Sequence, residues 1–233
     1  MVRAGAAQGL RIDMGPDTHR FLAGNYERPV QETLKRIVRS GDVCYDIGAN
    51  LGFFSLFLGR TVAAKGLVYA FEPVPRNASV IERNADLNGI ENIRVMRMAL
   101  SGEDGKADLL LARHVGGAML QEAGTPPDPA GSMVVATARI DTLVDRQEIR
   151  PPNVVKIDVE GAEMAVLVGM ERTLQKWSPR VVMEFDDPTE DGCESKLSDC
   201  RRFLQARGYR VRVLPNSYVD GGWFVRHIEA EQR

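Results

Sequence analysis

Acidic residues and glycines near the ends of two predicted strands have the spacing of a binding site for a small organic ligand. Gly48 and Gly52 lie between a predicted strand and a predicted helix, and Asp46 precedes both. Glycine permits a tight turn and the close approach of a ligand. Glu72 ends the next predicted strand. An acid about 20 residues beyond such a glycine turn accepts both hydroxyls of an adenosine ribose.

The same turn departs from the dinucleotide-binding pattern GxGxxG, which brings a pyrophosphate to a helix N-terminus. Asn50 stands in place of the middle glycine. The carboxylate of Asp46 would repel a pyrophosphate, so a cationic or zwitterionic ligand is favoured. An NAD-dependent oxidoreductase therefore stays open as an alternative, but these residues disfavour it.

A second group of charged residues follows the predicted strand at 153–158. Alternation along a strand places Lys156 and Asp158 on one side. Burial of Asp158 would be costly without a partner, and Lys156 can be that partner. Glu160 falls in the turn, whereas Glu163 falls in the first helical turn, where a carboxylate has a structural explanation. The predicted catalytic residues are Asp158, then Glu160, with Lys156.

A metal site is a further interpretation of the same region. Oxygen ligands for Mg²⁺ could converge from Asp158, Glu160, Glu184 and Asp186. This interpretation is not favoured, and no metal ligand is predicted.

The histidines are far apart in the sequence and make no zinc-binding spacing; they are His19, His114 and His227. Each is expected to be an exposed residue rather than a base. His114 is the best candidate base of the three, because it borders a predicted loop.

The elements that must position these residues alternate between strands and helices. Strands are expected at 43–47, 67–71, 93–97, 153–158 and 180–185. Such alternation indicates a parallel sheet covered on both faces. Two closing strands, at 209–214 and 222–228, have no helix between them and should pair antiparallel at an edge. The expected fold class is α/β, a doubly wound, mostly parallel Rossmann-like sheet with an antiparallel edge strand and an N-terminal helical extension.

The chain is expected to form one domain with additions. Residues 1–40 would form an extension and helix that cap the substrate side, and residues 41–233 the main domain. The segment from Gly116 to Ser132 is rich in Gly and Pro, which predicts a mobile loop at about 113–133. Such a loop would act as a lid.

Composition limits the class of partner. The 233 residues carry a net charge of −2, with a pI of about 6.0, so no basic excess favours nucleic acid. No apolar run is long enough to span a membrane. Three cysteines without a CxxC pair fit a reducing compartment, and the cytoplasm is expected.

Together these segments resemble class I S-adenosylmethionine-dependent methyltransferases and, more closely, the FkbM family of O-methyltransferases. The turn DIGANLG followed by FEP is typical of the superfamily, and KIDVEGAE is typical of the family. The resembling segments cover roughly residues 20 to 185; they are 25–27, 43–55, 71–73, 98–101 and 155–163.

The resemblance implies S-adenosyl-L-methionine as cofactor and S-adenosyl-L-homocysteine as product. The residues expected to bind the cofactor are Glu27, Asp46, Gly48, Asn50, Gly52, Phe53, Glu72, Pro73 and Ala99. Within this set the glycine turn would line the methionine part and Glu72 would hold the ribose. Pro73 would border the adenine, and Ala99, at the end of the third strand, would offer backbone to the adenine edge.

The expected function is O-methylation of a hydroxyl on a small molecule, a natural product or a sugar. A positioned base such as Asp158 would take the proton of the acceptor. A non-catalytic cofactor-binding module is a second alternative. A third is an RNA methyltransferase, which the pI disfavours. No oligomeric state is predicted.

Overall fold

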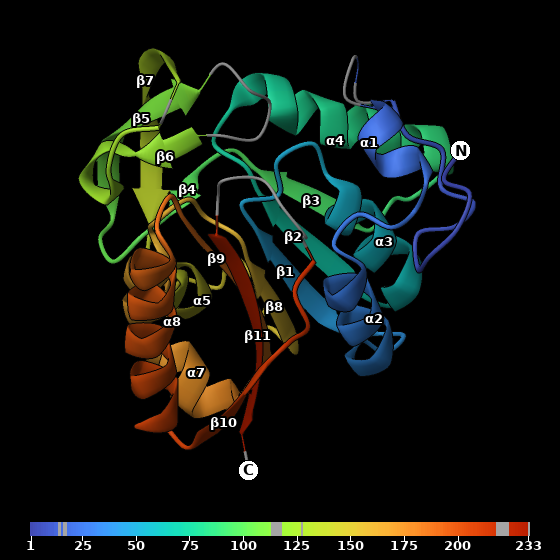
Figure 1. The fold of residues 1–233 in the computed structure, drawn as a ribbon. Coiled ribbons are helices and arrows are strands. Elements are labelled where there is room, and N and C mark those ends of the chain that lie inside the picture. Colours follow the sequence, from blue (N-terminus) through green and yellow to red (C-terminus); the bar gives the residue numbers. More distant parts are fainter. Residues whose placement is uncertain (14, 16–17, 113–117, 127, 218–223, 233) are drawn as a thin grey trace.

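The computed structural model describes residues 1–13, 15, 18–112, 118–126, 128–217 and 224–232. Within these residues the main sheet has the strand order β10-β11-β9-β8-β1-β2-β3 (Figure 1). Its parallel strands are β1 (Val43–Ile47), β2 (Leu67–Phe71), β3 (Ile93–Met96), β8 (Val154–Ile157) and β9 (Arg180–Asp187). The closing pair is antiparallel: β11 (Phe224–Gln232) pairs with β9, and β10 (Tyr209–Val213) forms the edge. The predicted fold class is confirmed.

Helices cover both faces of this sheet, because strand residues alternate between two apolar layers. Tyr45 packs toward one layer and Cys44 toward the other. The Tyr45 side holds α5 (Ile140–Asp145), α6 (Glu163–Gly169), α7 (Glu171–Trp177) and α8 (Glu190–Gln205). The Cys44 side holds α2 (Arg28–Ile37), α3 (Phe53–Val62) and α4 (Pro75–Asn88). Among the described residues, no helix is both long and apolar enough to cross a membrane.

The N-terminal residues pack on α3 and α4 rather than forming a separate body. Val2, Leu10 and Phe21, the last in α1 (Thr18–Leu22), belong to the same buried cluster as the apolar face of α3. Arg60 on α3 donates to the backbone carbonyls of Gln8 and Ala6 at 2.7 Å each. The extension therefore completes the core on the Cys44 side.

A second sheet lies beside the carboxyl ends of the main strands, with the order β4-β7-β5-β6 (Figure 1). It comprises β4 (Ala99–Leu100), β5 (Gly105–Ala112), β6 (Ala118–Leu120) and β7 (Pro129–Ala138), and a 3₁₀ helix, η2 (Gln121–Ala123), follows β6. The sequence analysis expected a mobile loop at about 113–133 in this region. The described part of that segment is largely regular, with β6, η2 and the start of β7 in it, and Leu120 and Val135 pack on Leu109 in a small apolar cluster. The mobility of that segment stays a prediction.

Candidate active site

The glycine turn after β1 lies directly against the turn after β8. Gly48 has a φ of +75°, and a Cβ there would meet the carbonyl oxygen of Asp158 at 1.8 Å. Gly52, with a φ of +86°, similarly leaves no room for a Cβ, because Ile81 would lie 2.8 Å from it. Asn50 between them also has a positive φ, of 51°. The sequence thus places glycine where close approach requires it, and the two predicted site regions meet.

Glu72, at the end of β2, lies beneath this turn and organises it. Its Oε2 accepts a hydrogen bond from the backbone N–H of Asn50 at 2.7 Å, and its Oε1 accepts one from Val74 at 2.8 Å. Burial raises the pKa of Glu72 to about 7, although both backbone hydrogen bonds act to lower it. Oε1 also accepts a hydrogen bond from Asn77 at 3.5 Å, so Oε2 is the oxygen that keeps a lone pair for the predicted contact with the ribose.

Asp46 and Lys156 form a buried charged pair below the turn. The Oδ2 of Asp46 accepts a hydrogen bond from Ser55 at 2.5 Å, and its Oδ1 lies 3.9 Å from the Nζ of Lys156. Burial raises the pKa of Asp46, and the attraction of Lys156 only partly offsets it. Lys156 also lies 4.7 Å above the ring of Phe54. Oδ1 of Asp46 is fully buried and accepts no hydrogen bond within the described part of the chain.

Lys156 and Asp158 pair as the strand alternation predicted. The Nζ of Lys156 donates to Oδ2 of Asp158 at 2.8 Å. Burial alone would lower the pKa of Lys156, but the charges of Asp158, Asp46 and Glu27 outweigh burial and raise it. The Lys156 side chain is 4% exposed and that of Asp158 is 26% exposed. Asp158 is therefore the part of this pair that a bound molecule can reach.

Glu160 lies in the turn that follows β8, and Glu163 is the first residue of α6. Burial, followed by the charge and hydrogen bond of Asp186, raises the pKa of Glu160 to about 10. Glu160 is thus protonated at neutral pH and acts as a hydrogen-bond donor in that state. Glu163 accepts from the backbone N–H of Gly161 at 2.8 Å, as its structural explanation predicted. Burial raises the pKa of Glu163 to about 8.

The sequence analysis missed a cluster formed by Glu27, Glu184 and His227. His227 is 1% exposed, so the prediction that each histidine is exposed is wrong for this residue. Its Nε2 lies 2.5 Å from Oε2 of Glu184, its register partner on β9, and 3.9 Å from Oε2 of Glu27. The signal was available: Val225, His227 and Glu229 alternate along the last strand and share its buried face.

Other predicted residues lie elsewhere. Phe53 is buried in an aromatic cluster, stacked on Phe21 at 5.3 Å and edge-on to Tyr26 at 5.4 Å. Ala99 was predicted at the end of the third strand, but that strand ends at Met96 and Ala99 belongs to β4 of the small sheet. The chain leaves the main sheet at this point to pair with β7. Pro73 is half-buried beside Glu72.

Two predictions concern residues that the structure does not describe. One is His114 as a candidate base, and the other is the part of the proposed lid at Gly116 and Gly117.

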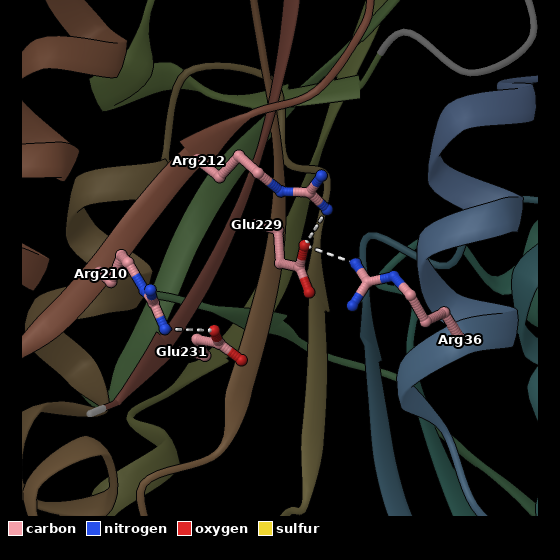
Figure 2. A pocket seen from close by; sticks show the side chains of 5 residues that line it. All are labelled: Arg36, Arg210, Arg212, Glu229 and Glu231. Carbon is pink, nitrogen blue, oxygen red and sulfur yellow. Dashed lines mark hydrogen bonds and ion pairs between the residues drawn. The ribbon is translucent and has the colours of Figure 1, made fainter.

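A pocket of about 400 Å³ lies at the opposite end of β11, between α2 and the β10 edge (Figure 2). Arg36 and Arg212 both bind Oε2 of Glu229, at 2.6 and 2.5 Å, and Arg210 binds Glu231 at 3.1 Å. Burial acts to raise the pKa of Glu229, but these two arginines outweigh it and lower the pKa. The ion pairs tie α2 to the sheet, so we assign this pocket a structural role.

Solved methyltransferase structures share this fold. A solved FkbM methyltransferase from Methylobacillus flagellatus is similar with a TM-score of 0.56 and 18% identity, over 90% of this chain and 46% of that one. The chain thus spans less than half the length of that protein. An S-adenosylmethionine-dependent methyltransferase from Aquifex aeolicus is similar with a TM-score of 0.52 and 15% identity, over 93% of each chain. The main sheet is that of Rossmann-like methyltransferases.

The sequence comparisons then give the family. The methyltransferase FkbM domain model matches residues 46–211. Hexuronic acid methyltransferase AglP of Haloferax volcanii is 32% identical over 178 residues, which cover 74% of this chain and 70% of that protein. The 31-O-demethyl-FK506 methyltransferase FkbM of Streptomyces tacrolimicus is 27% identical over 223 residues, 84% of this chain and 82% of that protein. This chain belongs to the FkbM methyltransferase family, and the oxidoreductase alternative is set aside.

Proposed function

We propose that this protein transfers a methyl group from S-adenosylmethionine to a hydroxyl oxygen of a small molecule, a natural product or a sugar. Two relatives support the choice of acceptor. One is named for a hexuronic acid, and the other for the 31-O position of FK506. The observation that carries the proposal is the contact of Gly48 with the backbone of Asp158, because it brings the predicted cofactor turn and a reachable carboxylate to one place.

The residues of this chain would hold the cofactor by charge and hydrogen bonds. The remaining lone pair on Oε2 of Glu72 suits a ribose hydroxyl, and the tight turn at Gly48 and Gly52 suits the methionine part. When bound, S-adenosylmethionine supplies a methyl group that its sulfonium has already activated. The protein then has to align the acceptor and take up its proton.

Asp158 is the proposed base. Its carboxylate is held by Lys156 at 2.8 Å and is the more exposed member of the pair. With the cofactor bound, Asp158 would accept the hydroxyl proton as the oxygen–methyl bond formed, and the sulfur of the cofactor would keep the electron pair of its broken bond to the methyl carbon. Glu160 is the weaker candidate, because a carboxyl with a pKa of about 10 holds its proton at neutral pH.

The remaining alternatives are disfavoured. A net charge of −2 argues against RNA as acceptor. A non-catalytic module would have no use for the buried Lys156–Asp158 pair beside the cofactor turn. All three cysteines are free and buried, which supports the proposal of a reducing compartment such as the cytoplasm.

The test is an acceptor screen with methyl-labelled S-adenosylmethionine, run on hexuronic acids, other sugars and macrolide alcohols. We expect label on one hydroxyl oxygen and the mass increase of one methylene group. The matched control is the same acceptor with that hydroxyl replaced by hydrogen, which should take no label. Label on nitrogen, on carbon or on RNA would contradict the proposal.

A further inference from the structure

Three side chains from separate elements meet on the α2 side of the main sheet. Glu27 precedes α2, Glu184 lies on β9 and His227 lies on β11. One ligand atom from each lies within 4.8 Å of the other two. We propose that these three side chains bind one divalent first-row transition-metal ion, for which Zn²⁺ and Mn²⁺ are suitable probes. The sequence analysis expected Glu27 to bind the cofactor and considered Glu184 as an oxygen ligand for Mg²⁺, but it did not bring either of them together with His227.

The donor set favours this kind of ion. One imidazole nitrogen and two carboxylate oxygens suit Zn²⁺, Fe²⁺ or Mn²⁺, whereas Mg²⁺ and Ca²⁺ prefer oxygen alone. Bonds of about 2.0–2.2 Å require ligand atoms roughly 3 Å apart. The β9–β11 register fixes His227 opposite Glu184, and the Nε2 of His227 lies 3.9 Å from Oε2 of Glu27. All three ligand atoms lie within 4.8 Å of one another, so binding of an ion requires the Glu27 side chain to move inward.

The charge at the cluster is also suited to a cation. Two of the three side chains are carboxylates that are largely removed from solvent, Glu27 at 1% and Glu184 at 16% exposure. The ammonium of Lys156 is bound to Asp158 at 2.8 Å. A bound divalent ion would be the largest local positive charge and would stabilise these carboxylates.

His227 presents an imidazole nitrogen to one of the two carboxylates. Its Nε2 and the Oε2 of Glu184 are 2.5 Å apart and form a hydrogen bond. A metal ion would replace the proton of that hydrogen bond, because binding requires both ligand atoms to be deprotonated.

Three protein ligands leave at least one coordination position open. Glu184 is 16% exposed, whereas His227 and Glu27 are each 1% exposed, so Glu184 is the member of the cluster that solvent reaches. An ion there can hold the hydroxyl oxygen of the acceptor and lower its pKa. This role rests on the proposed function, whereas the binding of the ion does not.

The test uses the full chain, stripped with a chelator. Mn²⁺ is titrated by electron paramagnetic resonance and Zn²⁺ by calorimetry, and the melting temperature is followed with each ion. We expect one ion per chain, and a loss of at least about 10-fold in affinity in both His227→Gln and Glu184→Gln. His19→Gln, a histidine change in α1, should bind as the wild type does.

Either of two results would overturn the site. One is a folded wild-type chain that binds neither ion at millimolar concentration, and the other is wild-type affinity in both ligand variants. If His227→Gln does not fold, Glu184→Gln alone decides, because glutamine keeps the size of the side chain. If the protein does not transfer a methyl group, the metal titrations are unaffected. Failure of the proposed function can therefore be distinguished from failure of the proposed metal site.

Discussion

Glu72 at the end of β2 accepts a hydrogen bond from the backbone N–H of Asn50 in the β1 turn, at 2.7 Å. One carboxylate thereby shapes the turn that is proposed to hold the methionine part and also faces the proposed ribose site. A second backbone hydrogen bond, from Val74, fixes the other oxygen. The acid is therefore a structural residue as well as a proposed ligand residue, which the sequence alone did not indicate.

Replacing Glu72 should weaken both binding and folding. Glu72→Ala removes the proposed acceptor for the ribose and leaves the backbone N–H groups of Asn50 and Val74 without their partner. Hydrogen bonds to a charged group are worth about 1.5–3 kcal/mol, so affinity for S-adenosylhomocysteine should fall about 10- to 150-fold. The free energy of unfolding should fall by about 1–3 kcal/mol. Calorimetry and chemical denaturation measure the two effects.

Glu82→Gln is the matched control for this variant, because Glu82 is half-exposed on α4 and pairs with Arg97 at the surface. It should alter neither quantity. Normal affinity in Glu72→Ala would place the ribose contact elsewhere.

Removing the charge of Asp158 should slow transfer without loosening the cofactor. A positioned base contributes about 10²- to 10⁴-fold, so Asp158→Asn should lower kcat within that range. Asparagine keeps the size of the side chain, and affinity for S-adenosylhomocysteine should change much less. The control is Asp145→Asn. Asp145 lies at the end of α5 and forms an exposed ion pair with Arg172. Near-wild-type kcat in Asp158→Asn, measured on the true acceptor, would remove Asp158 from the role of base.

The unliganded protein should become less stable as the pH rises from about 5 to about 8. Burial raises the pKa of Glu72 to about 7 and that of Glu163 to about 8, from a usual 4.5. The folded chain therefore holds more protons than the unfolded chain in this window, so the stability contribution is present at low pH and is lost as the pH rises. Urea denaturation at pH values of about 5 and about 8 measures how the free energy of unfolding changes with pH. Glu163→Gln should make this change smaller. A wild-type protein that becomes more stable as the pH rises would contradict these pKa shifts.

Glu229 should stabilise the docking of α2, and its effect should have the opposite pH dependence. Its pKa is lowered by Arg212 and Arg36, so the contribution is present above the usual pKa and is lost as the pH falls. Because Arg36 and Arg212 are half-exposed, we expect Glu229→Gln to cost about 1 kcal/mol at neutral pH. Glu231→Gln, at 34% exposure, should cost less. Equal stability of Glu229→Gln and wild type at neutral pH would contradict the role assigned to this pocket.

Several elements could be predicted from sequence because local patterns specify them. The apolar strands at 43–47 and 67–71 have the predicted bounds. The Lys156–Asp158 pair followed from alternation within one strand.

The sequence analysis missed the small sheet and the contacts of His227, because both depend on pairing between distant parts of the chain. The small sheet forms where the Gly- and Pro-rich segment pairs with β5, and such pairing leaves little periodic signal in the sequence. His227 meets Glu184 across 43 residues and meets Glu27 through the docking of α2. No spacing rule along the chain brings those three residues together.

The assignment of the cofactor site is tested most directly by hydrogen exchange, measured with and without S-adenosylhomocysteine, which shows where the ligand protects the backbone. Saturating ligand, at 100 times its dissociation constant, adds about 2.7 kcal/mol to the free energy of unfolding. We predict that local protection is strongest in peptides that cover the turn 46–52 and the turn 72–74, with the β10 edge at 209–213 as the internal control. NADH should protect neither turn. Absence of binding, or protection that leaves both turns unchanged, would contradict the assignment of these strand ends as the cofactor site.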